Sequence, residues 1–211
     1  RIADDYIVRA IKDEITDTFP IISEEAFAIG QSPEIGNGPF WLVDPLDGTK
    51  EFIKRNGEFT VNIALIDGGI PVFGVVHAPA IKNTYWGSPV GAFTEGEDGT
   101  AQPISCRPPP EDGLVALVSR SHRSPEIDTF LADFTVKEET SAGSSLKFCL
   151  VAAGRADIYP RLGRTMEWDT AAGEAVVRFA GGHVSTVDGV QMTYGKPGFE
   201  NPHFVVWGSG F

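Results

Sequence analysis

Two aspartates three residues apart are the strongest candidates for chemistry in this sequence. They stand in Asp44-Pro45-Leu46-Asp47-Gly48-Thr49, directly after the apolar run Phe40-Trp41-Leu42-Val43. A proline-fixed turn at the end of a buried strand can point two carboxylates into one small volume. Hard oxygen ligands of this kind suit a divalent cation, and a backbone carbonyl such as that of Leu46 can join them. Thr49 would add a hydroxyl able to orient a water molecule. The alternative is an ordinary turn, since Asp, Pro and Gly all favour turns.

The spacing of these two acids also bears on the mechanism. In phosphatases that use an aspartate nucleophile within an Asp-x-Asp-Gly-Thr loop, the second acid stands two residues after the first. Here Asp47 stands three residues after Asp44. The spacing therefore disfavours a covalent aspartyl-phosphate mechanism.

Two further acids could complete a set of four carboxylates. Glu24 closely follows the short apolar pair Ile21-Ile22, and Asp169 stands at the predicted start of a helix. Each has a plain alternative, because an isolated glutamate is usually solvated and Asp is a common helix N-cap. Asp169 would also bring the positive end of a helix dipole to the site, where a phosphate is stabilised.

The first part of the chain must position Glu24, Asp44 and Asp47. Apolar residues at helical spacing predict an amphipathic helix over residues 4–18 that lies on a core. Short apolar and alternating runs then predict a largely antiparallel sheet with two hairpins. Its expected strands are residues 21–22, 40–43, 59–66, 72–77, 83–86 and 91–94.

The second part of the chain must position Asp169. Residues 102–113 are rich in proline and polar residues, and we interpret them as a connector. Strands and helices then alternate, as in α/β proteins. The expected strands are 114–118, 135–137, 156–159 and 183–186, and the expected helices are 125–132, 144–153 and 169–180. We therefore predict one catalytic unit over 1–211, with an N-terminal metal-binding α+β half (1–105) and a C-terminal α/β half with nucleotide-binding elements (106–211).

The composition restricts the class of ligand that this protein can bind. The 211 residues carry 17 basic and 29 acidic side chains, a net charge of −12, which argues against a general binder of nucleic acid. A protein this acidic needs local positive charge, most simply a metal ion, to hold an anion. No stretch approaches 18 apolar residues, so no transmembrane segment is expected. Cys106 and Cys149 are too few for a disulfide framework, and Cys149 is expected to fill the core.

Three segments together resemble the inositol monophosphatase superfamily of Mg²⁺-dependent, lithium-sensitive phosphatases. They are Ser23-Glu24-Glu25, the run from Trp41 to Thr49, and Trp168-Asp169-Thr170-Ala171-Ala172-Gly173. The continuation from Lys50 to Thr60 and the run from Gly143 to Cys149 are similar to the bisphosphate nucleotidases of the CysQ type. The resemblance implies the α/β (α+β) fold of that superfamily, a layered αβαβα sandwich.

The resemblance also implies roles for individual residues. Two or three Mg²⁺ ions would be held by Glu24, Asp44, the Leu46 carbonyl, Asp47 and Asp169. The catalytic residues would be Glu24, Asp47 and Thr49, with a metal-activated water attacking the phosphorus in line. Substrate would contact this same region and a basic arm; the expected contacts are Glu24, Leu46, Asp47, Gly48, Thr49, His122, Ser144, Lys147, Arg161 and Asp169. For the basic arm the alternatives are a loop histidine at His122, a solvated helix residue at Lys147 and a surface ion pair at Arg161.

The implied reaction is Mg²⁺-dependent hydrolysis of the 3'-phosphate of adenosine 3',5'-bisphosphate to AMP and phosphate. The alternatives are an inositol-1-monophosphatase and a non-catalytic nucleotide-sensing protein. The partner is then a small-molecule nucleotide bisphosphate, and both a monomer and a homodimer are left open. We expect a cytoplasmic protein, with peripheral contact at the inner membrane face as an alternative. The family also carries an acidic Thr-x-Ala-Asp segment before its first helix, and this sequence starts after that point, at Arg1.

Overall fold

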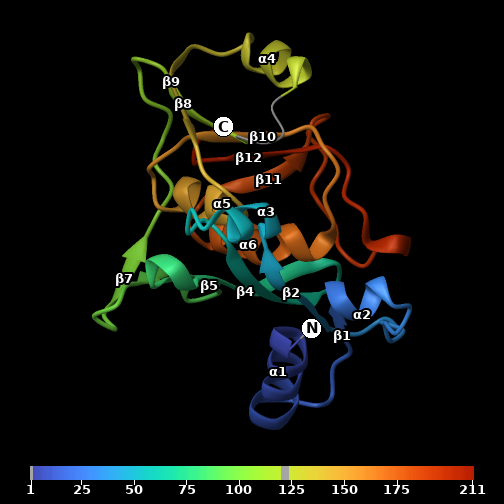
Figure 1. The fold of residues 1–211 in the computed structure, drawn as a ribbon. Helices are drawn as coiled ribbons and strands as arrows, with labels where there is room; N and C mark the ends of the chain where they lie inside the picture. The colour runs from blue at the N-terminus through green and yellow to red at the C-terminus, as the bar shows by residue number, and fades with distance from the viewer. Residues whose placement is uncertain (1, 120–123) are drawn as a thin grey trace.

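The computed structural model describes residues 2–119 and 124–211. Its strands form two sheets, and its helices fill the space between the sheets and cover their outer faces (Figure 1). Within these two ranges, no helix is both long enough and apolar enough to cross a membrane.

The first sheet contains seven strands in the order of the sequence. Strand β1 pairs with β2 in parallel, and every later neighbour pair is antiparallel. The strands are β1 (Ile21–Ser23), β2 (Phe40–Asp47), β3 (Thr60–Asp67), β4 (Ile70–Ala78), β5 (Asn83–Ser88), β6 (Gly91–Glu95) and β7 (Ala101–Ile104).

The second sheet is mixed and has the order β11-β12-β10-β8-β9. Strand β8 is parallel to both of its neighbours, whereas β12 is antiparallel to both of its own. The strands are β8 (Leu114–Val118), β9 (Val136–Ser141), β10 (Ile158–Arg161), β11 (His183–Thr186) and β12 (Phe204–Trp207).

The helices make the structure five layers deep, as Figure 1 shows from bottom to top. Helix α1 (Ile2–Ala10), extended by a π-helical turn (Ile11–Ile15), packs on the outer face of the first sheet. Helices α5 (Leu146–Ala152) and α6 (Glu167–Phe179) lie between the sheets, and α4 (Pro125–Leu131) covers the outer face of the second. The predicted αβαβα sandwich is confirmed. Shorter helical segments complete the chain: α2 (Glu24–Ala28), α3 (Thr49–Lys54) and the 3₁₀ turns Pro79–Ile81 and Pro197–Phe199.

The largest apolar cluster is shared by the two sheets and the two helices between them. It runs from Ile22 and Leu42 in the first sheet to Leu117 and Val206 in the second. Helix α6 approaches the first sheet so closely that a Cβ atom at Gly74 would lie 2.6 Å from the carbonyl oxygen of Ala172. The sheet therefore fixes the position of the helix that carries Asp169.

Several predicted elements differ from those in the structure. The helix predicted over 4–18 ends at Ile15, and residues 102–104 of the connector predicted over 102–113 belong to β7 at the edge of the first sheet. Strand β12 and helix α3 were not predicted at all. Strand β12 lies between β11 and β10, and its apolar run Phe204-Val205-Val206-Trp207 before Gly208 is a local strand signal that the sequence-based prediction did not use.

Candidate active site

A β-bulge, not a turn, places Asp44 and Asp47 on the same side of the chain. Strand β2 continues through Pro45 to Asp47, which corrects the expectation that the strand ends at Val43. Asp44 pairs with Asn62 and Asp47 with Thr60, so three steps along β2 match two along β3. Residues three apart in a regular strand point to opposite faces, and the extra residue of a bulge brings them to one face. A bulge also tolerates Pro45, which has no N–H to donate.

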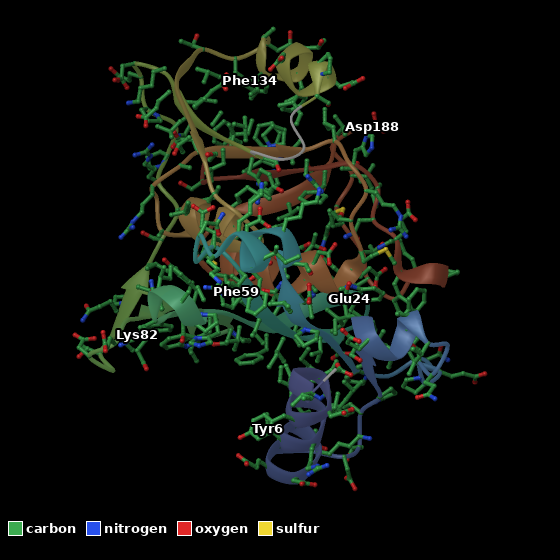
Figure 2. All side chains as sticks on the ribbon, viewed as in Figure 1. Tyr6, Glu24, Phe59, Lys82, Phe134 and Asp188 are labelled. Atoms are coloured by element: carbon green, nitrogen blue, oxygen red, sulfur yellow. The ribbon has the colours of Figure 1, made fainter. Side chains whose placement is uncertain are left out.

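Glu24 comes beside Asp44 because β1 pairs in parallel with β2. Ser23 is the register partner of Val43, so the residues that follow them, Glu24 and Asp44, lie beside each other. Ser23 is also the N-cap of α2, and its hydroxyl accepts a hydrogen bond from the Ala26 N–H at 3.2 Å. Glu24 is thus the first residue of this helix, and its carboxyl group is within hydrogen-bonding reach of Asp44. Figure 2 shows Glu24 at the level of α2, on the first sheet.

Asp47 is held by the loop that precedes α5. One carboxylate oxygen, Oδ2, accepts hydrogen bonds from the Ser145 N–H at 2.7 Å and the Ser145 hydroxyl at 2.6 Å. Thr60 and Asn62 on β3 donate to the same oxygen at longer range, 3.4 Å each. The second oxygen, Oδ1, accepts no hydrogen bond from the described residues, so it is the atom that a cation could reach.

Asp169 is the third residue of α6 and not its N-cap, which corrects the sequence-based expectation. The helix begins at Glu167 after the N-cap Met166, and Asp169 Oδ2 accepts a hydrogen bond from the Met166 N–H at 2.8 Å. This is the reciprocal half of a capping box. As in Asp47, one oxygen serves the backbone and orients the carboxylate.

Aromatic rings lock the two helix starts together. Phe27 of α2 lies 5.2 Å from the ring of Trp168 of α6, centroid to centroid, and 5.7 Å from Phe199. Rings at these separations attract one another in tilted and edge-on arrangements. Because α2 begins with Glu24 and α6 with Glu167, this cluster ties the helix of Glu24 to the helix of Asp169.

The four acids share one electrostatic environment. Burial raises the pKa of Asp44 well above its usual value, and the charges of Asp47 and Asp169 raise it further. Burial, followed by the charge of Asp47, raises the pKa of Asp169 to about 7. Partial desolvation also raises the pKa of Glu24. Carboxylates that perturb each other in this way are repulsive unless a proton or a cation compensates them.

This donor set fits Mg²⁺ in its chemistry. Among the residues that the structure describes, no group of three or more His, Cys, Asp or Glu side chains is arranged so that it could hold a metal ion. Mg²⁺ usually takes one or two carboxylates and completes its octahedron with water and substrate phosphate oxygens. An open group of carboxylates with one oriented oxygen each therefore suits this ion better than a closed protein cage would.

A cavity of about 280 Å³ opens beside the acids, between the two halves of the chain. Seven of the predicted site residues line it: Asp47, Gly48, Thr49, Ser144, Lys147, Arg161 and Asp169. Glu24, Asp44 and Leu46 lie outside its lining, although the electrostatics link both acids to Asp47. The structure thus brings most of the predicted residues to one place. His122 lies outside the described residues.

Two cations, Lys147 and Arg161, also line this cavity. Lys147 is buried in α5, and its ammonium donates to the carbonyl oxygens of Ser144 at 2.7 Å and Ala142 at 3.1 Å. Burial lowers its pKa to about 8. Arg161 ends β10 and donates to the Arg164 carbonyl at 3.3 Å. Lys147 is therefore a buried residue and not the solvated helix residue that was its alternative.

Sequence reasoning missed Ser145, Thr60 and Asn62. All three are buried and polar, and Ser145 contacts both Asp47 and the backbone carbonyl of Asp169, at 3.2 Å. A signal for two of them exists in the sequence. Thr60 and Asn62 occupy the inward face of β3, where the following inward residues, Ala64 and Ile66, are apolar. Polar residues on an inward strand face need partners, and such positions mark a buried polar site.

Comparison with known proteins gives consistent results. A family model described as the inositol monophosphatase family matches residues 1–205. The 3'(2'),5'-bisphosphate nucleotidase CysQ of Salmonella typhimurium is 48% identical over 199 residues, which cover 91% of this chain and 77% of that protein. The crystal structure of CysQ from Bacteroides thetaiotaomicron matches with a TM-score of 0.83 at 38% identity, over 99% of this chain and 82% of that one. The Thermotoga maritima IMPase matches with a TM-score of 0.78 at 27% identity, over 98% of this chain and 76% of that one.

Proposed function

The chain belongs to the inositol monophosphatase family, and from this membership we propose that it is a Mg²⁺-dependent 3'(2'),5'-bisphosphate nucleotidase. The reaction is hydrolysis of the 3'-phosphate of adenosine 3',5'-bisphosphate to AMP and inorganic phosphate. The relatives named as bisphosphate nucleotidases support this substrate class. The observation that carries the proposal is one cavity lined both by the oriented carboxylates of Asp47 and Asp169 and by the cations Lys147 and Arg161.

The residues that would hold Mg²⁺ are Glu24, Asp44, Asp47, Asp169 and the Leu46 carbonyl, and two or three ions are proposed. Bound Mg²⁺ supplies positive charge to the phosphate and makes a coordinated water more acidic. The chain itself orients the carboxylates: Ser145 holds one oxygen of Asp47, and Met166 holds one oxygen of Asp169. Thr49 and Glu24 would orient the attacking water, and Thr49 lines the cavity.

The substrate has a second phosphate, which needs a cation of the protein's own. Lys147 and Arg161 line the same cavity as Asp47 and Asp169 and would hold the 5'-phosphate there. Ser144 and Gly48 lie against each other at the edge of this cavity, where a Cβ atom on Gly48 would come 3.2 Å from that of Ser144. Gly48 has a φ of +87°, so a larger residue would be strained as well as crowded there. These two residues would pack against the substrate.

The test is a phosphate-release assay on the purified chain with two substrates and two metal conditions. We expect turnover of adenosine 3',5'-bisphosphate with Mg²⁺, none in EDTA, and much slower turnover of inositol-1-phosphate. Asp169→Asn should lower kcat by orders of magnitude. An amide is a weaker ligand than a carboxylate for Mg²⁺, whose positive charge stabilises the negative charge that develops in the transition state. Preference for inositol-1-phosphate would make the chain an inositol monophosphatase. Binding of the bisphosphate without release of phosphate would make it a sensor.

A further inference from the structure

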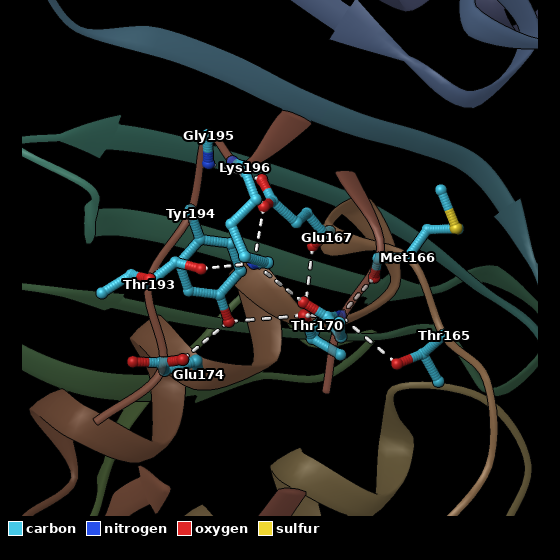
Figure 3. A network of polar contacts seen from close by, with 10 residues as sticks. Thr165, Met166, Glu167, Thr170, Glu174, Thr193, Tyr194, Gly195 and Lys196 are labelled. Carbon is cyan, nitrogen blue, oxygen red and sulfur yellow. Dashed lines mark hydrogen bonds and ion pairs between the residues drawn. The ribbon is translucent and has the colours of Figure 1, made fainter. Parts of the chain in front are cut away.

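A buried network of polar contacts joins the start of α6 to the segment 193–201 near the end of the chain. Figure 3 shows Thr165, Met166, Glu167 and Thr170 on one side and Thr193 to Lys196 on the other, with dashed lines for the contacts between them. Apart from Thr170, which belongs to the motif over 168–173, none of these residues was singled out by the sequence, and apart from Thr165 and Thr170 none lines the cavity. The network nevertheless ends on the backbone beside Asp169.

Asn201 makes the contacts that come nearest to Asp169. Its side-chain amide is buried and donates to the Met166 carbonyl oxygen at 2.7 Å and to the Thr170 hydroxyl at 3.0 Å. Its backbone N–H donates to the Thr165 carbonyl oxygen at 3.0 Å. Asn201 therefore binds the residues on both sides of Asp169.

Met166 transmits this contact to the carboxylate. Its N–H donates to Asp169 Oδ2 at 2.8 Å, while its carbonyl oxygen accepts from both Asn201 and the Asp169 N–H, the latter at 3.1 Å. A rotation of the Met166 backbone would thus break the bond that orients the Asp169 carboxylate. Asn201 restrains the carbonyl side of this residue and so opposes that rotation.

Glu167 anchors the same helix start from a second direction. Its carboxylate is fully buried and accepts hydrogen bonds from the Gly195 N–H at 2.6 Å and the Lys196 N–H at 3.0 Å. The Lys196 ammonium lies 2.6 Å from the same carboxylate. A buried charge is tolerated when it is paired and hydrogen-bonded in this way. The segment 193–201 is therefore firmly attached to the start of α6.

We propose that Asn201 is a positioning residue that holds Asp169 in its cation-binding orientation through the Met166 backbone. The inference rests on the proposed function, because it takes Asp169 to be a ligand of Mg²⁺. Groups that orient a metal ligand without touching the metal commonly change metal affinity or activity by roughly ten- to a hundredfold when they are removed. Asn201 meets that description, since it contacts Met166 and Thr170 but does not line the cavity.

The test measures Mg²⁺ binding by calorimetry without nucleotide, together with thermal unfolding. We expect Asn201→Ala to raise the Kd for Mg²⁺ at least roughly tenfold. Asn201→Asp keeps the size of the side chain but loses the donor, so it should have the same effect without opening a cavity. Tyr194→Phe is the matched control. It removes hydrogen bonds to Glu174 and Thr170 within the same network but makes no contact with Met166. It should lower Tm and leave the Kd within about twofold of the wild type, since Met166 still orients Asp169.

The outcomes separate the two proposals. Wild-type protein that neither binds Mg²⁺ nor releases phosphate would overturn the proposed function, whatever Asn201 does. Wild-type binding with an unchanged Kd in both Asn201 variants would overturn the positioning role alone. A rise in Kd as large in Tyr194→Phe as in the Asn201 variants would assign the effect to general destabilisation. Failure of both Asn201 variants to fold would make Asn201 a folding residue and likewise overturn the proposal.

Discussion

The hydroxyl of Ser145 joins the two acids that come from opposite halves of the chain. It lies 2.6 Å from Asp47 Oδ2 and 3.2 Å from the Asp169 carbonyl oxygen, and it accepts from the Asn62 amide at 2.7 Å. A hydrogen bond to a charged group contributes about 1.5–3 kcal/mol. A single buried serine therefore sets the geometry of Asp47 relative to the start of α6.

Ser145→Ala should lower kcat and raise the Kd for Mg²⁺, each by roughly tenfold or more, because Asp47 loses its shortest hydrogen bond. The measurements are steady-state turnover of the bisphosphate and calorimetric titration with Mg²⁺. Ser185→Ala is the control, since Ser185 is also buried but accepts its hydrogen bond from Trp207 in the second sheet. Equal effects of the two variants would contradict the role of Ser145 at the site.

Lys147 allows a test of substrate specificity. Its ammonium has three N–H donors, and the carbonyls of Ala142 and Ser144 occupy two of them. If the third holds the 5'-phosphate, Lys147→Ala should lower kcat/KM for the bisphosphate by roughly tenfold to a hundredfold. Turnover of a substrate with only the scissile phosphate should be preserved. An equal loss on both substrates would instead assign Lys147 to the support of the loop over residues 142–144.

The lowered pKa of Lys147 gives the same hypothesis a pH dependence. Burial lowers this pKa to about 8, so the ammonium loses its charge as the pH rises through that value. The KM for the bisphosphate should therefore increase above about pH 8, while the KM for the substrate with one phosphate changes less. The measurement is KM against pH for both substrates, on wild type and on Lys147→Ala. If the KM of the wild type changes with pH in the same way for both substrates, Lys147 does not hold the 5'-phosphate.

At the scale of elements, the closeness of α6 to the first sheet decides where Asp169 lies. Two glycines permit this approach, because a Cβ atom at Gly74 or Gly87 would come 2.6 Å from a carbonyl oxygen of the helix. The contact joins β4 and β5 to Ala172 and Ala175 of α6, the turns of the helix that follow Asp169, and it includes none of the acids themselves. A change there should act on the site only by moving the helix.

Gly74→Ala should overpack this contact and lower the free energy of unfolding by about 1–3 kcal/mol. For a chain of this length the expected fall in Tm is roughly 2–12 °C. Mg²⁺ affinity should fall as well, since the helix must shift outward with Asp169. Gly38→Ala is the control, because a Cβ atom there meets nothing within 4 Å. A Gly74→Ala protein with wild-type Tm would show that the sheet yields instead.

Across the whole molecule, folding brings acids from both halves of the chain into one site, where their negative charges repel one another. Glu24, Asp44 and Asp47 come from the first sheet and α2, and Asp169 comes from α6. Folding raises the pKa of Asp169 from 3.8 to about 7. A group with a raised pKa binds its proton more tightly in the folded state, so without a cation the free energy of unfolding falls as the pH rises across this window.

Mg²⁺ should therefore stabilise the protein more at about pH 8 than at about pH 5, because it binds the ionised carboxylates. At roughly a hundredfold excess over its Kd, a ligand adds about 2.7 kcal/mol, or roughly 5–10 °C in Tm for a chain of this length. Thermal unfolding with and without Mg²⁺ at both pH values measures the difference. Asp169→Asn should show a smaller shift. If Mg²⁺ shifts Tm equally at both pH values, the ion does not bind through these ionised carboxylates.

Local sequence features were enough to identify the four acids and most of the secondary structure. The spacing of Asp44 and Asp47, the apolar run before them and the capping pattern at Asp169 are local features, and they identified the acids and the layered fold through resemblance. Local features also predicted most strands and helices, because their apolar period is set by neighbouring residues. The prediction left out β12, although its run Phe204-Val205-Val206-Trp207 is itself a local strand signal.

The contacts between these residues depend on the tertiary structure. The parallel register of β1 against β2 sets Glu24 beside Asp44, and the bulge in β2 turns Asp47 to the face of Asp44. The loop before α5 brings Ser145 to an acid 98 positions away in sequence. Strand register, bulges and loop packing depend on contacts between distant segments, whose free energy the local sequence does not contain. For that reason the sequence could name the acids, but the folded chain was needed to find Ser145 and Asn201, which orient them.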